Sequence, residues 1–335
     1  MSPRLSIVVP TRNGRPYIKD CLSALGDQVL DDVEVIVVDD ASSDGSADAV
    51  LDLFPGVKLL TLRTQQGFAS ACNTGIRAAT AGYVALLNND TAADPLWAAR
   101  LVEFLDNNSG AGFCASRVVF HSAPDVVDSC GDFYAVEGVA GKIGHLETAR
   151  SFDTPCEVFG ASASAAIYRR ELLQELGGFD EDFYLVHEDT DLSFRARLMG
   201  HTCHFVPSAI VRHHVGGTLG YRSPAAEYHA SRNQEFVFLK DMPAPLLIRY
   251  FAWHLLANGL QFAAHATRGR AGPWLRGKRD ALLSVTEVLG KRTEIQRMAR
   301  ASPDAIDRVL MRGWSADAIR RGKLRRRRSP ARAGG

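Results

Sequence analysis

The feature that most constrains the fold is a regular alternation of short apolar runs with helical patterns over the first 90 residues. Helical patterns at residues 15–25 and 68–79 separate runs that have the length of buried strands. Four such runs occur, at residues 5–9, 33–38, 57–62 and 83–87. This alternation predicts an α/β fold with a doubly wound, mostly parallel Rossmann-like sheet flanked by helices.

Polar clusters follow three of these runs, at residues 10–14, 39–46 and 88–90. In doubly wound sheets ligands bind beyond the carboxyl ends of the strands, so these clusters predict a binding site. The sequence lacks the glycine-rich G-x-G-x-x-G turn after the first strand, and it lacks a G-x-x-x-x-G-K-[ST] loop. Both absences argue against a dehydrogenase, a kinase and an NTPase.

Charge is distributed unevenly along the chain. Residues 245–335 carry 20 Lys or Arg against 6 Asp or Glu, whereas residues 1–244 carry 19 against 32. We therefore expect a catalytic domain over residues 1–240, a helical extension over 241–319 and a basic, disordered tail over 320–335. The tail suits an anionic membrane surface, and a merely solvated tail is the alternative. Nucleic acid is not expected, because no base-stacking aromatic residues lie among these charges.

One long apolar stretch covers residues 246–266, but Arg249, His254, Asn258 and His265 interrupt it. We expect no bilayer span here. An amphipathic helix that covers the sheet is favoured, and a helix lying in the membrane interface is the alternative. The cysteines are scattered without a C-x-x-C pair, and the N-terminus has no signal pattern, so we expect a cytoplasmic protein. If the tail binds lipid, the protein would lie at the inner face of the plasma membrane.

Eight short motifs in this order together resemble family 2 glycosyltransferases, in particular their bacterial rhamnosyltransferase-like branch. They are IVVPTRN (7–13), VVDDASSDGS (37–46), GFASACNTG (67–75), LLNND (86–90), FGA (159–161), GGFDE (177–181), EDTD (188–191) and HVGGT (214–218). The resemblance covers roughly residues 4–240. It implies an inverting enzyme with the GT-A fold, here followed by a C-terminal helical extension.

By this resemblance the donor nucleotide binds at the first strand ends. The implied residues are Pro10, Thr11, Arg12, Asp40, Gly67, Asn73 and Asn89. Asp40 would accept a hydrogen bond from the imide of a uracil or thymine base. The alternative is that Asp39 and Asp40 cap the helix that follows.

Asp90 stands where the family carries its metal-binding D-x-D motif, and Asn88 and Asn89 precede it. Carboxylate oxygens suit a divalent cation, Mg²⁺ or Mn²⁺, that neutralises the charge of a departing diphosphate. His214 matches the family's H-x-G-G spacing and is the second implied metal ligand, although a lone histidine is as often structural.

Inversion by single displacement needs one base to take the proton of the acceptor hydroxyl. By resemblance Asp189 is this base and Glu188 supports it, whereas the alternative is that both acids merely favour a helix N-terminus. Four further residues are expected near the acceptor or the phosphates: Phe179, Asp180, His213 and Arg232.

The resemblance thus implies transfer of a sugar, with rhamnose one candidate, from a dTDP- or UDP-sugar. The acceptor would be a hydroxyl of a cell-envelope glycan or lipid-linked glycan. A catalytically inactive nucleotide-sugar-binding relative is disfavoured because Asp40, Asp90 and Asp189 are all present. A nucleotidyltransferase is disfavoured because the glycine-rich, basic N-terminal loop that would bind a triphosphate is missing.

Overall fold

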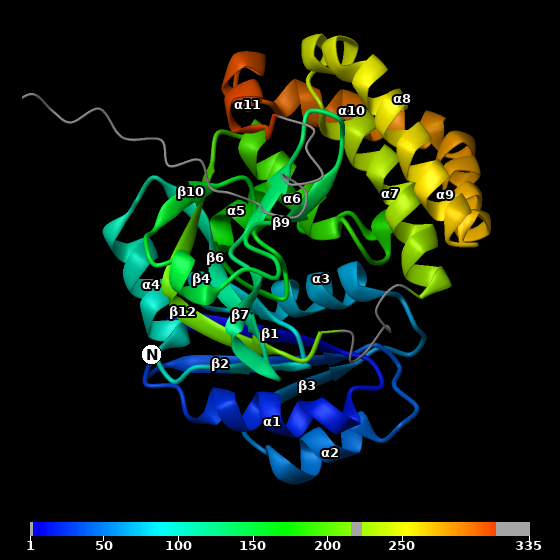
Figure 1. The fold of residues 1–335 in the computed structure, drawn as a ribbon. Coiled ribbons are helices and arrows are strands. Elements are labelled where there is room, and N and C mark those ends of the chain that lie inside the picture. Colours follow the sequence, from blue (N-terminus) through cyan, green and yellow to red (C-terminus); the bar gives the residue numbers. More distant parts are fainter. Residues whose placement is uncertain (1–2, 216–222, 313–335) are drawn as a thin grey trace, which may run out of the picture.

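The computed structural model describes residues 3–215 and 223–312 (Figure 1). Its first part consists of four parallel strands and the helices between them, as the alternation predicted. The strands are β1 (Leu5–Thr11), β2 (Val33–Asp39), β3 (Lys58–Thr61) and β4 (Tyr83–Leu87). The helices are α1 (Arg15–Gly26), α2 (Ser46–Leu53) and α3 (Phe68–Ala78).

The second part adds further strands, most of which the sequence did not predict. They are β5 (Thr91–Ala93), β6 (Ala111–Phe120), β7 (Ala123–Ser129), β10 (Cys156–Val158), β11 (Ala165–Arg169) and β12 (Thr202–His213). A separate hairpin pairs β8 (Asp132–Tyr134) with β9 (Ala140–Lys142). The helices are α4 (Trp97–Asn107), α5 (Arg170–Leu176) and α6 (Glu188–Leu198), with short 3-10 turns at Ala149–Ser151 and Glu181–Phe183.

The central sheet has the strand order β10-β12-β6-β11-β4-β1-β2-β3. One half, β4-β1-β2-β3, is parallel, and β12 also runs parallel to β6. Strand β11 is inserted antiparallel between β4 and β6. Because β11 runs opposite to β4, its amino end lies at the same edge as the carboxyl end of β4. Segments from both parts of the chain therefore meet at that edge.

Helices cover both faces of the sheet, which confirms the predicted α/β arrangement. Residues of β1 such as Ile7 pack with α1, α2 and α4, through buried side chains that include Ile18 and Trp97. On the opposite face Val8 packs with α3, α5 and α6. The alternation of Ile7 and Val8 between the two cores follows from the two-residue period of a strand.

The C-terminal part is helical, as expected. It comprises α7 (Pro224–Asp241), α8 (Ala244–Thr267), α9 (Ala271–Leu283), α10 (Val285–Met298) and α11 (Pro303–Val309). A third core joins these helices to α6. Among the described residues, no helix is long and apolar enough to cross a bilayer. The predicted basic tail at 320–335 lies outside the described residues.

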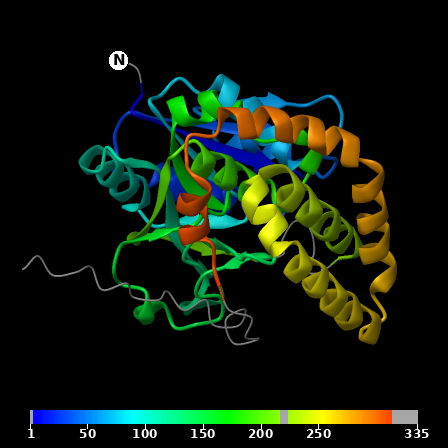
Figure 2. The same cartoon turned by 90° about the horizontal axis from the view of Figure 1, so that it is seen from above.

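The expectation that residues 246–266 cover the sheet is wrong. They form α8, which packs on other helices at the periphery of the molecule (Figures 1 and 2). Only Leu246, His254 and Ala257 of this helix are buried. Both faces of the sheet are covered by other helices, one by α1, α2 and α4 and the other by α3, α5 and α6.

Candidate active site

A cleft of about 330 Å³ opens beyond the carboxyl ends of β1, β2 and β4. Its wall contains most of the residues that the sequence assigned to donor and metal binding: Pro10, Thr11, Arg12, Asp40, Gly67, Asn89 and Asp90. It also contains His213, which was expected near the acceptor or the phosphates. Gln65, Phe68, Tyr184 and Leu185 complete the wall, together with Asn13, Ala71 and Asn88. The polar clusters at the three strand ends therefore converge on one cavity.

Asp40 is held at the end of β2 by the backbone on the far side of the cleft. Its Oδ1 accepts a hydrogen bond from the Gln66 N–H at 2.6 Å, and its Oδ2 accepts one from the Gly67 N–H at 2.9 Å. Arg12 Nη1 donates to the Asp40 carbonyl at 2.7 Å. The carboxylate of Asp40 does not cap α2, which was the alternative role for this residue. Asp44 accepts a hydrogen bond from the Ser46 N–H there instead.

Tyr184 forms a part of the cleft wall that sequence reasoning missed. Its ring packs so closely on Gly67 that a Cβ at Gly67 would lie 2.4 Å from a ring carbon. Gly67 also has φ +92°, which a residue with a side chain rarely adopts. The ring of His229 stacks on Tyr184 at 5.2 Å. Gly67, the first glycine of the GFASACNTG motif, thus makes room for the Tyr184 ring.

His213, not His214, faces the carboxylate of Asp90. His213 Nε2 lies 3.2 Å from Asp90 Oδ1, and His213 Nδ1 lies 3.0 Å from Asp128 Oδ2. Burial would lower the pKa of His213, but the hydrogen bonds to Asp128 and Asp90 outweigh it and raise the pKa to about 9. Asp128 is fully buried on β7, and no sequence motif marked it.

The ring of His214, the residue that the motif spacing suggested as a ligand, lies away from the cleft wall. It stacks on His121 at a centroid distance of 3.6 Å, while its backbone N–H donates to the Asp90 carbonyl at 2.9 Å. Burial and the neighbouring His121 lower the pKa of His214, although the charges of Asp90 and Asp20 oppose them. The glycines at 216 and 217 lie outside the described residues.

The residues around Asp90 offer hard oxygen atoms that fit a divalent cation. Asn88 Oδ1 is buried and accepts no hydrogen bond from any described residue, and Asp90 Oδ1 faces the same cleft. Mg²⁺ binds through one or two protein oxygens and takes its remaining ligands from water or substrate phosphates. Within residues 3–215 and 223–312, no cluster of three His, Cys, Asp or Glu groups could hold a metal alone. Any cation here would take its remaining ligands from water or from a bound phosphate.

Asp189 lies in the first turn of α6, close to the strand end that carries Asn88. The Ala163 N–H donates to Asp189 Oδ2 at 3.2 Å, and the Asn88 N–H donates to the Ser164 carbonyl at 3.0 Å. The short segment that leads into β11 thus contacts both residues. Asp189 itself is half-buried.

Glu188 differs from its neighbour Asp189 in being buried. Burial, followed by the charges of Asp189 and Asp191, raises the pKa of Glu188 well above its usual value. Glu188 Oε2 also has no hydrogen-bond partner among the described residues. The pair therefore divides into the half-buried carboxyl group of Asp189 and the buried carboxyl group of Glu188, in which burial favours the protonated form.

The remaining predicted residues lie outside the cleft wall. The side-chain amide of Asn73 bonds the backbone of Phe179 on both sides, at 2.9 Å to the carbonyl and 2.8 Å to the N–H. Phe179 is buried in the core. Arg232 donates to the carbonyls of Asp182 and Phe183. These contacts support the backbone of the 178–187 segment.

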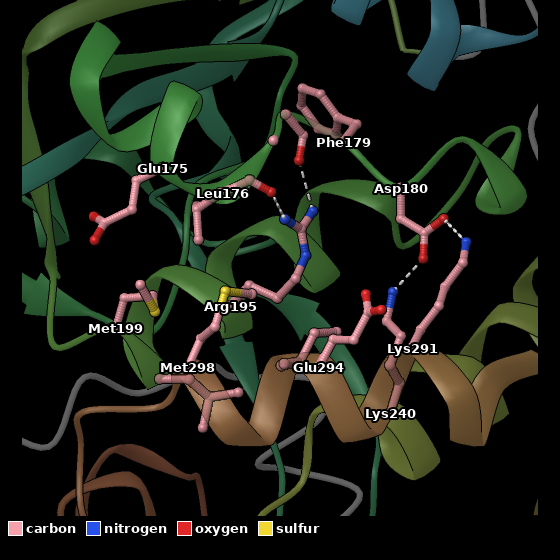
Figure 3. A pocket seen from close by; sticks show the side chains of 14 residues that line it. Glu175, Leu176, Phe179, Asp180, Arg195, Met199, Lys240, Lys291, Glu294 and Met298 are labelled. Carbon is pink, nitrogen blue, oxygen red and sulfur yellow. Dashed lines mark hydrogen bonds and ion pairs between the residues drawn. The ribbon is translucent and has the colours of Figure 1, made fainter.

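Asp180 lies at a second cleft, of about 260 Å³, between α5, α6 and α10. Figure 3 shows Asp180 between two lysines, Lys240 of α7 and Lys291 of α10. Lys240 and Lys291 each contact one of its oxygens at 2.5 Å. The charge of Lys240 and the hydrogen bonds of both lysines hold the pKa of Asp180 well below its usual range, although burial opposes them. The extension is thereby fixed to this segment.

Asn233, from α7, holds the backbone that joins Tyr184 to Glu188. It is fully buried, and its Nδ2 lies 2.9, 2.8 and 2.7 Å from the carbonyl oxygens of Phe183, Leu185 and Val186. Tyr184, Val186 and His187 all have positive φ, at 62°, 65° and 71°. Such residues cost about 1–3 kcal/mol each and persist only where the surroundings hold them.

Comparison with known proteins gives one family. The family profile described as "Glycosyl transferase family 2" matches residues 6–177, about half of the chain. An N-acetylglucosaminyl-diphospho-decaprenol L-rhamnosyltransferase of Mycobacterium tuberculosis is 28% identical, over 72% of this chain and 85% of that protein.

Two solved structures share the fold. A mannosyltransferase from Pyrobaculum calidifontis in complex with GDP-Man and Mn²⁺ has a TM-score of 0.53 at 23% identity, covering 89% of this chain and 85% of that one. S. aureus TarS 1–349 in complex with UDP-GlcNAc has a TM-score of 0.56 at 18% identity, covering 94% of each chain. The similarity extends over the C-terminal helices as well as the sheet.

Proposed function

The chain belongs to glycosyl transferase family 2, and from that premise we propose that it transfers a sugar with inversion from a pyrimidine nucleoside-diphosphate sugar, dTDP- or UDP-linked, to a hydroxyl of a lipid-linked glycan. The carrying observation is the single cleft that Asp40 and Asp90 share at the carboxyl edge of the sheet. The rhamnosyltransferase relative, whose name includes a diphospho-decaprenol acceptor, supports this acceptor class and makes rhamnose the first sugar to test.

In this proposal the donor spans the cleft, with its base beside Asp40 and Tyr184 and its diphosphate beside Asn88 and Asp90. A bound Mg²⁺ or Mn²⁺ would neutralise charge on the departing diphosphate. The protonated His213 next to Asp90 adds a further positive charge, and Asp128 orients its ring. The arrangement favours an anionic diphosphate at this end of the cleft.

Asp189 is proposed as the general base. The acceptor oxygen attacks the anomeric carbon, the bond from that carbon to the diphosphate oxygen breaks, and the nucleoside diphosphate leaves with the electron pair. The acceptor proton passes to Asp189. Because burial disfavours ionisation of Glu188, we assign the role of base to Asp189, the more exposed of the two carboxyl groups.

The test is a donor screen with the full chain and a lipid-linked glycan acceptor, measuring nucleoside-diphosphate release and product formation with Mg²⁺ or Mn²⁺. Asp189→Asn is expected to lower kcat at least ~100-fold, because a positioned base contributes about that much, while the melting temperature stays near that of the wild type. Asp153→Asn, which changes an exposed carboxylate elsewhere, serves as the control. Near-normal turnover by Asp189→Asn would remove Asp189 from the mechanism.

A further inference from the structure

The outward face of α8 is apolar along its whole length. Ile248, Leu255 and Phe262 follow one another at seven-residue intervals, two helical turns apart, and are 77%, 55% and 40% exposed. Phe251 and Leu256 flank this line, and both are also exposed. The helix contains no Asp or Glu in its 24 residues. We call these five side chains the α8 face.

The opposite side of α8 is fixed to the protein. His254 lies in the middle of the helix, with Nδ1 at 2.8 Å from the Glu137 carbonyl and Nε2 at 2.9 Å from Glu235 of α7. Leu246 and Ala257 are buried on the same side. The α8 face is thus presented by an anchored helix and is not the result of a loosely placed one (Figure 2).

The carboxyl end of α8 lies beside the start of α7, close to the donor cleft. Arg270, just after α8, pairs with Glu227 of α7 at 3.0 Å. Two residues further along α7, His229 stacks on Tyr184, which is part of the cleft wall. A surface that contacts α8 would therefore also lie near the site where an acceptor must enter.

Charge selects among the possible occupants of this face. Residues 245–335 carry 20 Lys or Arg and only 6 Asp or Glu. Arg268 and Arg276 follow α8 closely and are exposed. A second copy that docked through the same face would bring two strongly basic regions together, at an electrostatic cost. An anionic surface has the opposite charge, and its apolar layer accepts the exposed leucine and aromatic side chains.

We propose that the α8 face is a membrane-docking surface, which lies in the interface of an anionic bilayer with the helix axis parallel to the membrane plane. Phe251 and Phe262, which are 44% and 40% exposed, add aromatic rings to the apolar side of the helix that would enter the bilayer. Docking in this orientation brings the cleft close to the membrane, where a lipid-linked acceptor is held.

The test uses the full chain and vesicles without donor or acceptor, so that its outcome is independent of the proposed transferase activity. Co-sedimentation with vesicles of phosphatidylcholine and phosphatidylglycerol is compared with that for phosphatidylcholine alone. The variant Ile248→Ser/Leu255→Ser/Phe262→Ser is expected to lower the partition coefficient on anionic vesicles at least ~10-fold, since each buried apolar side chain contributes to binding.

The matched control is Val29→Ser/Leu51→Ser/Leu53→Ser, which removes three apolar side chains that are 61%, 60% and 52% exposed outside the α8 face. It should bind vesicles like the wild type. Equal binding by the wild type and the α8 variant would overturn the proposal. So would no binding at all, or a wild-type dimer that the α8 variant converts to a monomer.

Discussion

The amide of Asn233 is expected to hold the segment between Tyr184 and Glu188 in its working conformation, and Asn233→Ala tests this. The substitution removes the donor to three backbone carbonyls. A neutral hydrogen bond contributes about 1 kcal/mol, and each buried carbonyl left without a donor costs roughly 1–3 kcal/mol. With two N–H groups lost, the segment should be destabilised by about 2–4 kcal/mol.

Since about 1.4 kcal/mol changes an equilibrium tenfold, this loss raises the open population of the segment by roughly 30-fold to several hundred-fold. Hydrogen exchange measured by mass spectrometry should therefore accelerate by this factor at residues 183–187, where three residues with positive φ need external support. Transfer should fall as well, with kcat/KM lower by at least ~10-fold, because Tyr184 and Asp189 lose their common support.

The control is Gln234→Ala, the next residue on α7. Gln234 is also buried, but its amide bonds Asn258 and not the 183–187 segment. It should leave both the exchange rate of that segment and the catalytic constant close to wild type. Wild-type exchange in Asn233→Ala, or an equal acceleration in Gln234→Ala, would refute the assigned role of Asn233.

Three further predictions concern the cleft and the charges around it. Gly67→Ala should raise the KM for the donor at least ~10-fold by displacing the Tyr184 ring. The control Gly56→Ala should leave this KM unchanged, because its Cβ would meet open space, and equal KM values for the two variants would contradict the contact between Gly67 and Tyr184. Chelation by EDTA should abolish transfer, Mg²⁺ or Mn²⁺ should restore it, and persisting activity would exclude the cation. Burial would raise the pKa of Glu235, but the hydrogen bond from His254 and the charge of Lys278 outweigh burial and hold this pKa at about 2. The contribution of ionised Glu235 to the free energy of unfolding is complete above its ordinary pKa of 4.5 and is lost as the pH falls toward 2. Denaturant titrations should therefore show a shallower fall of the free energy of unfolding for Glu235→Gln than for the wild type over this range.

The parallel half of the sheet was predictable because its signals are local. Strands β1, β2 and β4 are mostly apolar runs followed by polar residues, which is the pattern of buried strands flanked by helices. β11 has no such signal. Its five residues, AAIYR, are too few to show a period, and their antiparallel insertion between β4 and β6 depends on partners distant in the sequence.

The histidine at the cleft illustrates a second limit. Successive side chains of a strand point to opposite faces, so a shift of one residue exchanges His213 and His214. Motif spacing alone selected His214, but the end of β12 turns His213 toward Asp90. The contribution of Asn233 was equally invisible, since three carbonyl contacts with a segment about 50 residues earlier depend on the folded backbone.

The antiparallel insertion of β11 also separates two tasks within one sheet. The walls that face the proposed nucleotide come mainly from the continuous stretch before residue 91, whereas the proposed base enters through residues 162–164 and α6, after a long excursion that includes the β8–β9 hairpin. That excursion supplies β5, β6, β7 and β10 to the sheet, and β7 carries Asp128, which contacts His213 in the cleft wall. The β8–β9 hairpin, by contrast, forms a separate two-stranded sheet. This hairpin is therefore the part to exchange in chimeras designed to alter the acceptor without altering the donor.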